Sequence, residues 1–292
     1  MKKIYALLSL LVVVLTTQAQ NFTQLWKKTV ANNDFTWLNT GTGNNNATSL
    51  AYNPATDKLL VSIRNDRVFI INPATGAEEG TLNTTGVGTE AFKYNKIRVT
   101  SDGVIYAISL QTTGGNNCKI YRWANQTATP TLCAEFPVTE RCGDAFGLSG
   151  TGNNTVLYAS GSQLANNALT GPFNIYILNT VNGQNFFVES KVSMTSAPTA
   201  NQQWPNRVVE PAGTGVNGDI WIKGGGFNAR RISVGPNNAG TRTGTVVETI
   251  EDGVGNGQAS LGYGGMKYME MDGRKYLAFA GGNNGNANSR MK

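Results

Sequence analysis

The 292-residue sequence contains no histidine. Histidine is the usual general base near neutral pH and the commonest protein ligand of transition metals. Its absence excludes the Ser-His-Asp and Cys-His arrangements of nucleophilic hydrolases. It also excludes most catalytic zinc sites, which depend on imidazole ligands. An enzyme built on this chain would need carboxylate or amide side chains instead.

Charged residues make up only 14% of the chain, and they are scattered along it. Lysine and arginine number 24 against 18 aspartates and glutamates, a net charge of +6. Arg230-Arg231 is the nearest approach to a basic cluster. Nucleic-acid-binding proteins gather such residues on one face or along one helix. The scattered pattern favours an ordinary solvated basic surface and no nucleic-acid partner.

Cysteine is rare, with three residues, too few for a small disulfide-rich scaffold. Cys118 and Cys133 flank a predicted hairpin, Lys119–Leu132, symmetrically about its centre. In a tight register they would face one another, so a cross-strand disulfide is expected if their Cβ atoms approach to about 4 Å. Cys142 is left over, either as a buried apolar residue or as a free thiol.

Long hydrophobic runs are absent except at the N-terminus. Lys2-Lys3 precede an apolar run, Ala6–Leu15, and Thr17-Gln18-Ala19 supplies small residues for cleavage. This order predicts a signal peptide over residues 1–19. The run is short for a membrane anchor, and no later stretch reaches that length. We therefore expect a secreted protein, periplasmic or extracellular, with no membrane span after signal removal.

A short phrase returns five times in the rest of the chain. Each copy is a polar turn, then an apolar strand, then small residues. The strands centre on Leu60, Ile105, Leu157, Ile220 and Leu277. A repeat of about 50 residues is typical of β-propellers. No later segment has apolar residues at helical spacing, which indicates an all-β chain.

Each repeat reads as four short strands separated by turns rich in Asn, Asp, Gly and Pro. Four-stranded blades packed face to face in a ring would bury both faces of every sheet. The sequence thus predicts one β-propeller domain over residues 20–292, with about five repeats. The fifth repeat offers Met266–Met271 and Tyr276–Ala280 and lacks two strands. Either Phe22–Val30 completes it as a strand, or, as we favour, the chain is part of a larger propeller.

The segment Val68–Glu78, with its Asn-Pro-Ala-Thr-Gly turn, resembles quinoprotein-like and surface-layer (YVTN-type) propellers. A closer resemblance, over most of the chain from Leu25, is to a family of uncharacterised secreted bacterial propellers, a domain of unknown function. It is carried by Trp37–Gly41, Leu50–Thr56, Lys96–Ala107, Ile120–Asn125 and Gly143–Phe146. It implies a propeller fold and export, and no catalytic residues.

Propeller sites usually lie in loops that connect the outer strand of one blade to the inner strand of the next. These are predicted here as Thr84–Asn95, Pro137–Asp144, Ser193–Asn206 and Glu251–Gly265. The candidate ligand-binding residues in or beside them are Glu90, Arg141, Asp144, Trp204, Arg207 and Tyr263. Arg141 and Asp144 either face a ligand or, the favoured interpretation, form a structural ion pair. Trp204 either stacks on a sugar ring or packs in the structure.

Metal and cofactor motifs are missing. Asp102-Gly103, Asp219 and Asp272-Gly273 suggest oxygen ligands, but Asp-Gly is explained more simply by tight hairpin turns. There is no EF-hand pattern, no sialidase box and no adjacent cysteine pair. No cofactor, metal site or catalytic residue is predicted.

Two functions remain open at this stage. The first, which we favour, is a non-catalytic exported propeller that binds a protein or glycan partner. The alternative is a metal-dependent propeller hydrolase or lactonase that uses carboxylates in the channel. It would need several Asp, Glu or Asn side chains that converge at the axis. A cell-envelope structural protein is a third, weaker interpretation.

Overall fold

Strands dominate the computed structural model, which describes residues 24–29, 32, 34–39, 46–165, 168–194, 203–225, 229–250, 266–271 and 273–279. Among them, the helical elements are two short 3-10 turns, η1 (Thr36–Asn39) and η2 (Gly152–Asn154). The all-β prediction is confirmed. The described part of the chain contains no helix with the length and apolarity that a membrane crossing requires. The predicted signal peptide, 1–19, lies outside the described residues.

Each predicted repeat forms its own antiparallel run of strands in chain order. The first sheet contains β1 (Ala47–Asn53), β2 (Lys58–Ile63), β3 (Val68–Ile71) and β4 (Glu78–Thr81). The second contains β5 (Lys96–Val99), β6 (Ile105–Ile108), β7 (Asn116–Trp123) and β8 (Thr131–Val138).

The third and fourth repeats share one eight-stranded sheet. The third supplies β9 (Arg141–Ser149), β10 (Val156–Ala165), β11 (Ala168–Thr180) and β12 (Phe186–Met194). The fourth supplies β13 (Gln203–Pro211), β14 (Ile220–Gly225), β15 (Arg230–Val234) and β16 (Thr241–Thr249). Their outer strands, β12 and β16, pair in parallel from Lys191↔Thr241 to Met194↔Gly244. A hairpin, β17 (Met266–Met271) and β18 (Arg274–Phe279), begins the fifth repeat.

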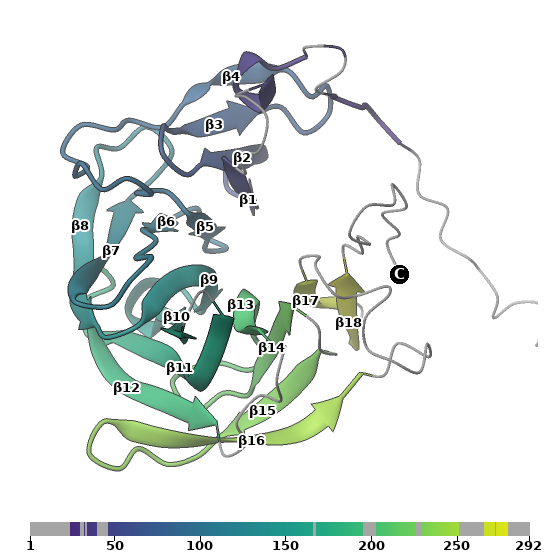
Figure 1. Ribbon diagram of the computed structural model, residues 1–292. Coiled ribbons are helices and arrows are strands. Elements are labelled where there is room, and N and C mark those ends of the chain that lie inside the picture. Colours follow the sequence, from purple (N-terminus) through teal and green to yellow (C-terminus); the bar gives the residue numbers. More distant parts are fainter. Residues whose placement is uncertain are drawn as a thin grey trace, which may run out of the picture.

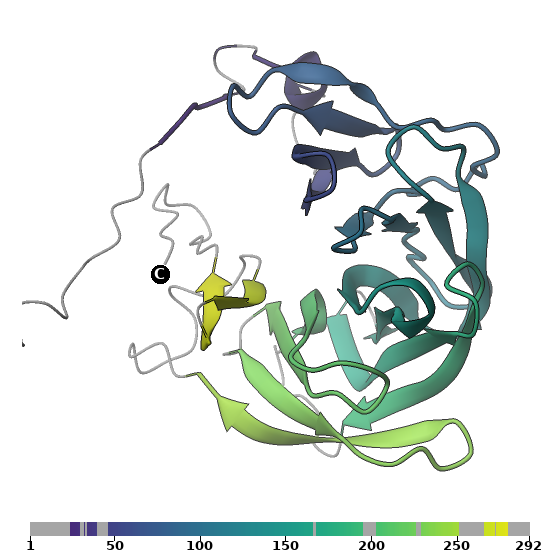
Figure 2. The same ribbon diagram turned by 180° about the vertical axis from the view of Figure 1, so that it is seen from behind.

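The sheets stand like blades around a common centre (Figure 1). The first strand of each repeat lies nearest the middle, and the fourth strand, where described, lies on the outside. Seen from behind, the first sheet and the β17–β18 hairpin lie at the two ends of the arc of blades (Figure 2). The five repeated phrases fall on β2, β6, β10, β14 and β18, the second strand of every blade. The predicted repeat therefore corresponds to a spatial one.

Hydrophobic cores lie between neighbouring blades. Leu60 and Ile70 of the first blade pack with Ile97 and Trp123 of the second. Similar clusters join the second blade to the third, the third to the fourth, and the fourth to Met266 of the hairpin. Burial of one such side chain stabilises the fold by about 1.5–3 kcal/mol. Each blade is thus covered by its neighbours, as a strand that is apolar at successive positions requires.

The segment before the first blade differs from its prediction. Phe22–Val30 was the less favoured candidate for a strand that completes the last blade, and its described residues, 24–29, form no strand. The indole of Trp26 instead donates a hydrogen bond of 2.7 Å to the Pro73 carbonyl of the first blade. Phe35, Trp37 and Phe69 form a stack with centroid spacings of 4.6 and 4.7 Å. This segment covers the outer face of the first blade because that face carries Phe69 and Ile71.

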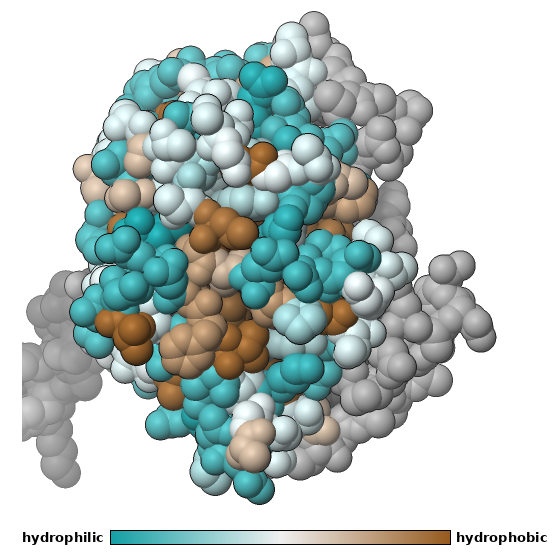
Figure 3. All heavy atoms as spheres, turned by 90° about the vertical axis from the view of Figure 1, so that its left-hand side faces the viewer, coloured by the Kyte–Doolittle hydropathy of each residue, from teal (hydrophilic) through white to brown (hydrophobic). Residues whose placement is uncertain are grey.

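The outer side of the second and third blades carries an apolar area among polar residues (Figure 3). Large apolar residues that are exposed on these outer strands include Leu132 on β8 and Phe187 on β12. Scattered exposed apolar residues are normal on soluble proteins.

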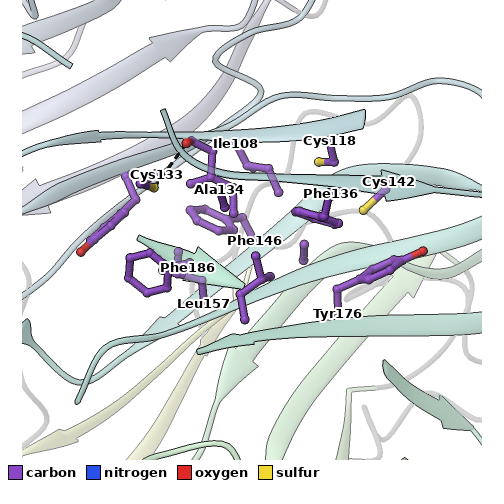
Figure 4. Close-up of a cluster of buried hydrophobic side chains, with 14 of the residues drawn as sticks. Ile108, Cys118, Cys133, Ala134, Phe136, Cys142, Phe146, Leu157, Tyr176 and Phe186 are labelled. Atoms are coloured by element: carbon purple, nitrogen blue, oxygen red, sulfur yellow. Dashed lines mark hydrogen bonds between the residues drawn. The ribbon is translucent and has the colours of Figure 1, made fainter. Parts of the chain in front are cut away.

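The predicted Cys118–Cys133 disulfide is absent, and all three cysteines are buried free thiols. The centre of the hairpin lies one residue later than predicted, since Tyr121 pairs with Leu132, and a bulge between Ile120 and Tyr121 adds one more position, so that Cys118 pairs with Phe136. The Cys133 thiol instead donates to the Ile120 carbonyl at 3.3 Å. Cys118, Cys133 and Cys142 all lie in the core between the second and third blades (Figure 4). Burial raises the pKa of Cys133 to about 12, as expected for a thiol in apolar surroundings.

Candidate functional site

The candidate residue Glu90 lies in the predicted loop between β4 and β5, but it faces the second blade. Its carboxylate pairs with Lys119 on β7 and accepts a hydrogen bond of 3.1 Å from the Tyr121 hydroxyl. Burial raises the pKa of Glu90, but Lys119, a backbone amide and Tyr121 outweigh it and lower the pKa overall. Together with Asn117 and Glu135, Glu90 and Lys119 line a polar cavity of about 370 Å³.

Arg141 and Asp144 were predicted in a loop, but both lie on the inner strand β9. β8 continues to Val138, which pairs with Asn116 of β7, and β9 begins at Arg141, which pairs with Ser162 of β10. The Arg141 guanidinium binds both carboxylate oxygens of Asp144, through Nη2 at 2.7 Å and through Nε. Hydrogen bonding to Asp144 raises the pKa of Arg141. The two side chains thus form the ion pair that we favoured.

The remaining candidates are only partly described. Trp204 and Arg207 were expected in or beside a loop, but their backbones belong to the inner strand β13. Tyr263 lies outside the described residues. The predicted site residues whose side chains are described, Glu90, Arg141 and Asp144, are all held in ion pairs within the protein.

A cavity of about 680 Å³ lies between inner strands of the blades. Its lining comes from β1, β5, β13 and β17, with part of β2 and of the turn after β5. These strands are far apart in the sequence, and the blade arrangement brings them together near the middle (Figure 1). We call this space the axial cavity. Ligand sites in proteins are typically concave spaces of about 300–1,000 Å³, so the axial cavity has the size for a small ligand.

One wall of the axial cavity is apolar and exposed. Leu50 and Tyr52 on β1 are 60% and 50% exposed, and they lie two residues apart, on one face of the strand. The Tyr52 hydroxyl donates a hydrogen bond of 2.9 Å to Asp57, which raises the pKa of Tyr52. This bond orients the aromatic ring without burying it. Exposed aromatic side chains that are held in place are typical of binding surfaces.

Three cationic side chains also line the axial cavity: Lys96 and Arg98 on β5, and Lys267 on β17. Lys267 forms an ion pair with Glu210, whose side chain is only 2% exposed. Arg98 Nη2 is 3.8 Å from the second carboxylate oxygen of Glu210. Lys96 Nζ donates to the Thr48 carbonyl at 2.7 Å. The cavity therefore combines an apolar wall with a cationic one.

Sequence reasoning placed candidate residues in loops and did not select Arg98, Lys267 or Tyr52. The available signal was Lys96-Ile97-Arg98, in which two cations alternate along a predicted inner strand. Side chains two residues apart on a strand share a face, so both had to point away from the buried Ile97. Their convergence with Lys267 depends on two strands, β5 and β17, that are distant in sequence.

Among the residues that the structure describes, no three His, Cys, Asp or Glu side chains come together as metal ligands would. Asp102 and Asp219 lie before the second strands of their blades, as the turn interpretation predicts, and Asp272 lies outside the described residues. Gly103 has a φ of 88° and Gly273 a φ of 70°, a backbone conformation that glycine adopts readily.

Comparison of the sequence with protein-family models and with curated proteins finds no match. Among solved structures, the chain is similar to that of a DUF4623 family protein from Bacteroides eggerthii, with a TM-score of 0.58 and 15% identity over 88% of this chain and 54% of that one. It is also similar to a protein of unknown function from Bacteroides thetaiotaomicron, with a TM-score of 0.46 and 17% identity over 80% of this chain and 52% of that one. The chain spans about half the length of these structures. At such identity, the first likeness concerns the fold alone.

Proposed function

We propose that the protein is an exported, non-catalytic binding module that takes a glycan into the axial cavity. Export follows from the signal peptide predicted over residues 1–19. The observation that carries the binding role is the exposed pair Leu50 and Tyr52 on the wall of a cavity of about 680 Å³. A protein partner would be served better by a flat rim, whereas a concave space with an aromatic wall suits a sugar ring.

The roles of the cavity residues follow from their chemistry. A sugar ring has apolar C–H faces and a polar edge. The exposed ring of Tyr52 offers a flat apolar surface for one such face, and Leu50 extends it. Thr48 and Ser49 on the same strand place hydroxyl groups in the cavity lining, beside the cations of β5. These groups can exchange hydrogen bonds with the hydroxyls of the sugar.

Binding should be tested on the purified full chain with a panel of oligosaccharides, by thermal shift and by isothermal titration calorimetry. A ligand that binds the native state raises the melting temperature, because 100 Kd of free ligand stabilises it by about 2.7 kcal/mol. Tyr52→Ala should weaken binding by tenfold or more, since aromatic anchors commonly contribute over about 1 kcal/mol. Tyr52→Phe should keep most of the affinity, because the ring remains.

Tyr276→Ala is the matched control, because Tyr276 is an exposed tyrosine that lines a different cavity. The proposal fails if no oligosaccharide of the panel binds, or if Tyr52→Ala and Tyr276→Ala weaken binding equally. Calcium across the millimolar range tests the alternative hydrolase. A clear calcium-dependent rise in melting temperature would favour that alternative over the binding role.

A further inference from the structure

We infer that the sugar bound in the axial cavity carries an anionic group, a carboxylate or a sulfate ester, which the Arg98 and Lys267 side chains recognise. This inference rests on the proposed function and names the ligand class of the same site. Two observations support it. Cationic side chains outnumber carboxylates around the cavity, and the Arg98 guanidinium has hydrogen-bond donors without an acceptor.

Charges converge on the cavity from three blades. Arg98 comes from β5, Glu210 from β13 and Lys267 from β17. Two cations thus face one carboxylate, even before Lys96 is considered. Among the described residues that line the cavity there is no aspartate or glutamate. Like charges held close together repel, most strongly where solvent is partly excluded. The single charge of Glu210 balances only one of the two cations, so an anion bound in the cavity would balance the other.

The Arg98 guanidinium has hydrogen-bond donors without an acceptor among the described residues. Its side chain is 20% exposed. Nη1 donates to the Ile97 carbonyl at 2.9 Å, while Nη2 is 3.8 Å from Glu210, beyond hydrogen-bond distance. Nε is buried without a hydrogen-bond partner. The planar guanidinium fork binds carboxylate and sulfur or phosphorus oxyanions through two parallel hydrogen bonds. Arg98 is therefore prepared for an acceptor that the protein does not supply.

The other polar cavities differ in this respect. The cavity beside Glu90 is lined by two carboxylates and one cation, Lys119. A further cavity is lined by Arg231, Lys275 and Glu248, and Arg231 is paired with both Asp219 and Glu248. The axial cavity, with three lining cations and no lining carboxylate, has the larger excess of positive charge. The general basicity of the chain does not explain it.

The apolar wall of the cavity favours an anion that also has an apolar surface. An inorganic phosphate or sulfate would meet Arg98 and Lys267 but would leave Leu50 and Tyr52 in contact with water. A sugar acid spans both features, because its ring can rest on Tyr52 while its charged group reaches the cations. The geometry therefore points to an acidic sugar unit over a free inorganic anion.

The test compares three oligosaccharides that differ in one group: trigalacturonate, its methyl ester and galactotriose. Calorimetry on the full chain at low ionic strength should show trigalacturonate binding at least tenfold tighter than its ester, because hydrogen bonds to charged groups add roughly that much. The advantage should shrink between about 0.01 M and 0.15 M salt, as the Debye length falls from about 30 Å to about 8 Å. A 6-sulfated galacto-oligosaccharide forms a fourth arm, and tighter binding of either acidic form identifies which anion is preferred.

Arg98→Met should remove most of the preference for the acid over the ester and leave binding of the ester nearly unchanged. Arg98→Lys keeps the charge without the fork, so it should retain part of the preference and serves if Arg98→Met does not fold. Arg67→Met removes the same charge from an exposed turn, where the side chain is 50% exposed, and should change nothing.

The outcomes separate the two proposals. Equal affinity for the acid, the ester and galactotriose, unaffected by Arg98→Met, overturns the anionic ligand and leaves a neutral glycan-binding module standing. Failure of all four oligosaccharides and of the wider panel overturns both. Binding of inorganic sulfate as tightly as of the sulfated oligosaccharide overturns the inference that the sugar ring is recognised.

Discussion

Two arginines, Arg242 with a buried side chain and Arg98 with a partly exposed one, differ in their hydrogen bonding at the rim and at the axis. Arg242, on the outer strand β16, has a side chain only 3% exposed. Its guanidinium reaches four acceptors within 2.9 Å: Ser190 Oγ, Glu189 Oε1, Asn217 Oδ1 and the Gly235 carbonyl. Arg98, at the axis, makes one hydrogen bond to a backbone carbonyl and leaves Nε without a partner.

The difference indicates that the two arginines have different roles. A buried charge is tolerated where every donor is satisfied, and it is costly elsewhere. At the rim, Arg242 on β16 bonds both to residues of β12 in the third blade and to residues of its own fourth blade. It therefore joins the two blades and stabilises the fold. At the axis, the incomplete bonding of Arg98 is retained although it contributes little to the fold. Arg242, which stabilises the fold, has its hydrogen-bond donors paired, whereas Arg98, which we assign to binding, does not.

The largest expected effect comes from removing the saturated arginine. Arg242→Met removes the cation that faces Glu189 and the donor that Asn217 accepts from, and loss of one member of a buried charged network costs about 3–5 kcal/mol of unfolding free energy. Chemical denaturation measures it. Arg98→Met should cost less than about 1 kcal/mol in the same assay. A similar loss in both variants would remove the distinction between rim and axis.

A second effect concerns Glu140, a saturated carboxylate between the second and third blades that is 5% exposed. It accepts hydrogen bonds from Thr139 at 2.5 Å, Tyr176 at 2.8 Å and Asn174 at 2.9 Å. Glu140→Gln should cost about 1–3 kcal/mol, because a buried charge-assisted network loses its acceptor charge. The control is Glu135→Gln, at an exposed site on β8 where Asn117 is the hydrogen-bond partner.

The pH dependence of stability tests the same carboxylate. Burial raises the pKa of Glu140, but the hydrogen bonds from Thr139, Asn174 and Tyr176 outweigh it and lower the pKa overall. A folded-state pKa below the unfolded value means that the native state holds its proton less tightly. Its stabilisation is therefore present above about pH 4.3 and is lost as the pH falls through the folded-state pKa. Glu140→Gln should flatten this part of the stability curve, and an unchanged slope would contradict the assignment.

The smallest expected effect concerns Arg141, which lies on an inner strand as Arg98 does but is paired with Asp144. Arg141→Gln should cost about 1 kcal/mol, since the pair is bidentate but its side chains remain 25% and 15% exposed. Glycan affinity should stay within twofold, because Arg141 does not line the axial cavity. Titration calorimetry beside Arg98→Met gives the contrast. Loss of affinity in Arg141→Gln would place it in the binding site.

Most strands could be predicted from the sequence because turn residues interrupt short apolar runs. The ranges Lys58–Ile63, Arg230–Val234 and Met266–Met271 were predicted with the bounds that the structure has. The Cys118–Cys133 pairing was wrong because the hairpin turns one residue later than the spacing of the cysteines suggests, and a bulge shifts the register by one more position. Neither feature leaves a mark in an apolar pattern. Local patterns determine strands, whereas register also depends on packing against the third blade.

The binding site was harder to predict than the fold for a similar reason. Arg98, Glu210 and Lys267 lie on three strands separated by more than a hundred positions from first to last, and nothing local marks them as neighbours. The loop rule also misplaced Arg141 and Asp144, because the connection between β8 and β9 is only two residues long. Once the bounds of the inner strands are known, the alternation of side-chain direction along each strand identifies which side chains face the axis.

The parallel pairing of β12 with β16 has a mechanical consequence. Separating the third and fourth blades means breaking a ladder of main-chain hydrogen bonds, whereas the first and second blades meet mainly through side chains. Local opening follows the interface with fewer such bonds. Of these two junctions, widening of the axial cavity to admit a ligand should therefore occur beside β1 and β5, which also carry Tyr52 and Arg98, while the third and fourth blades move together.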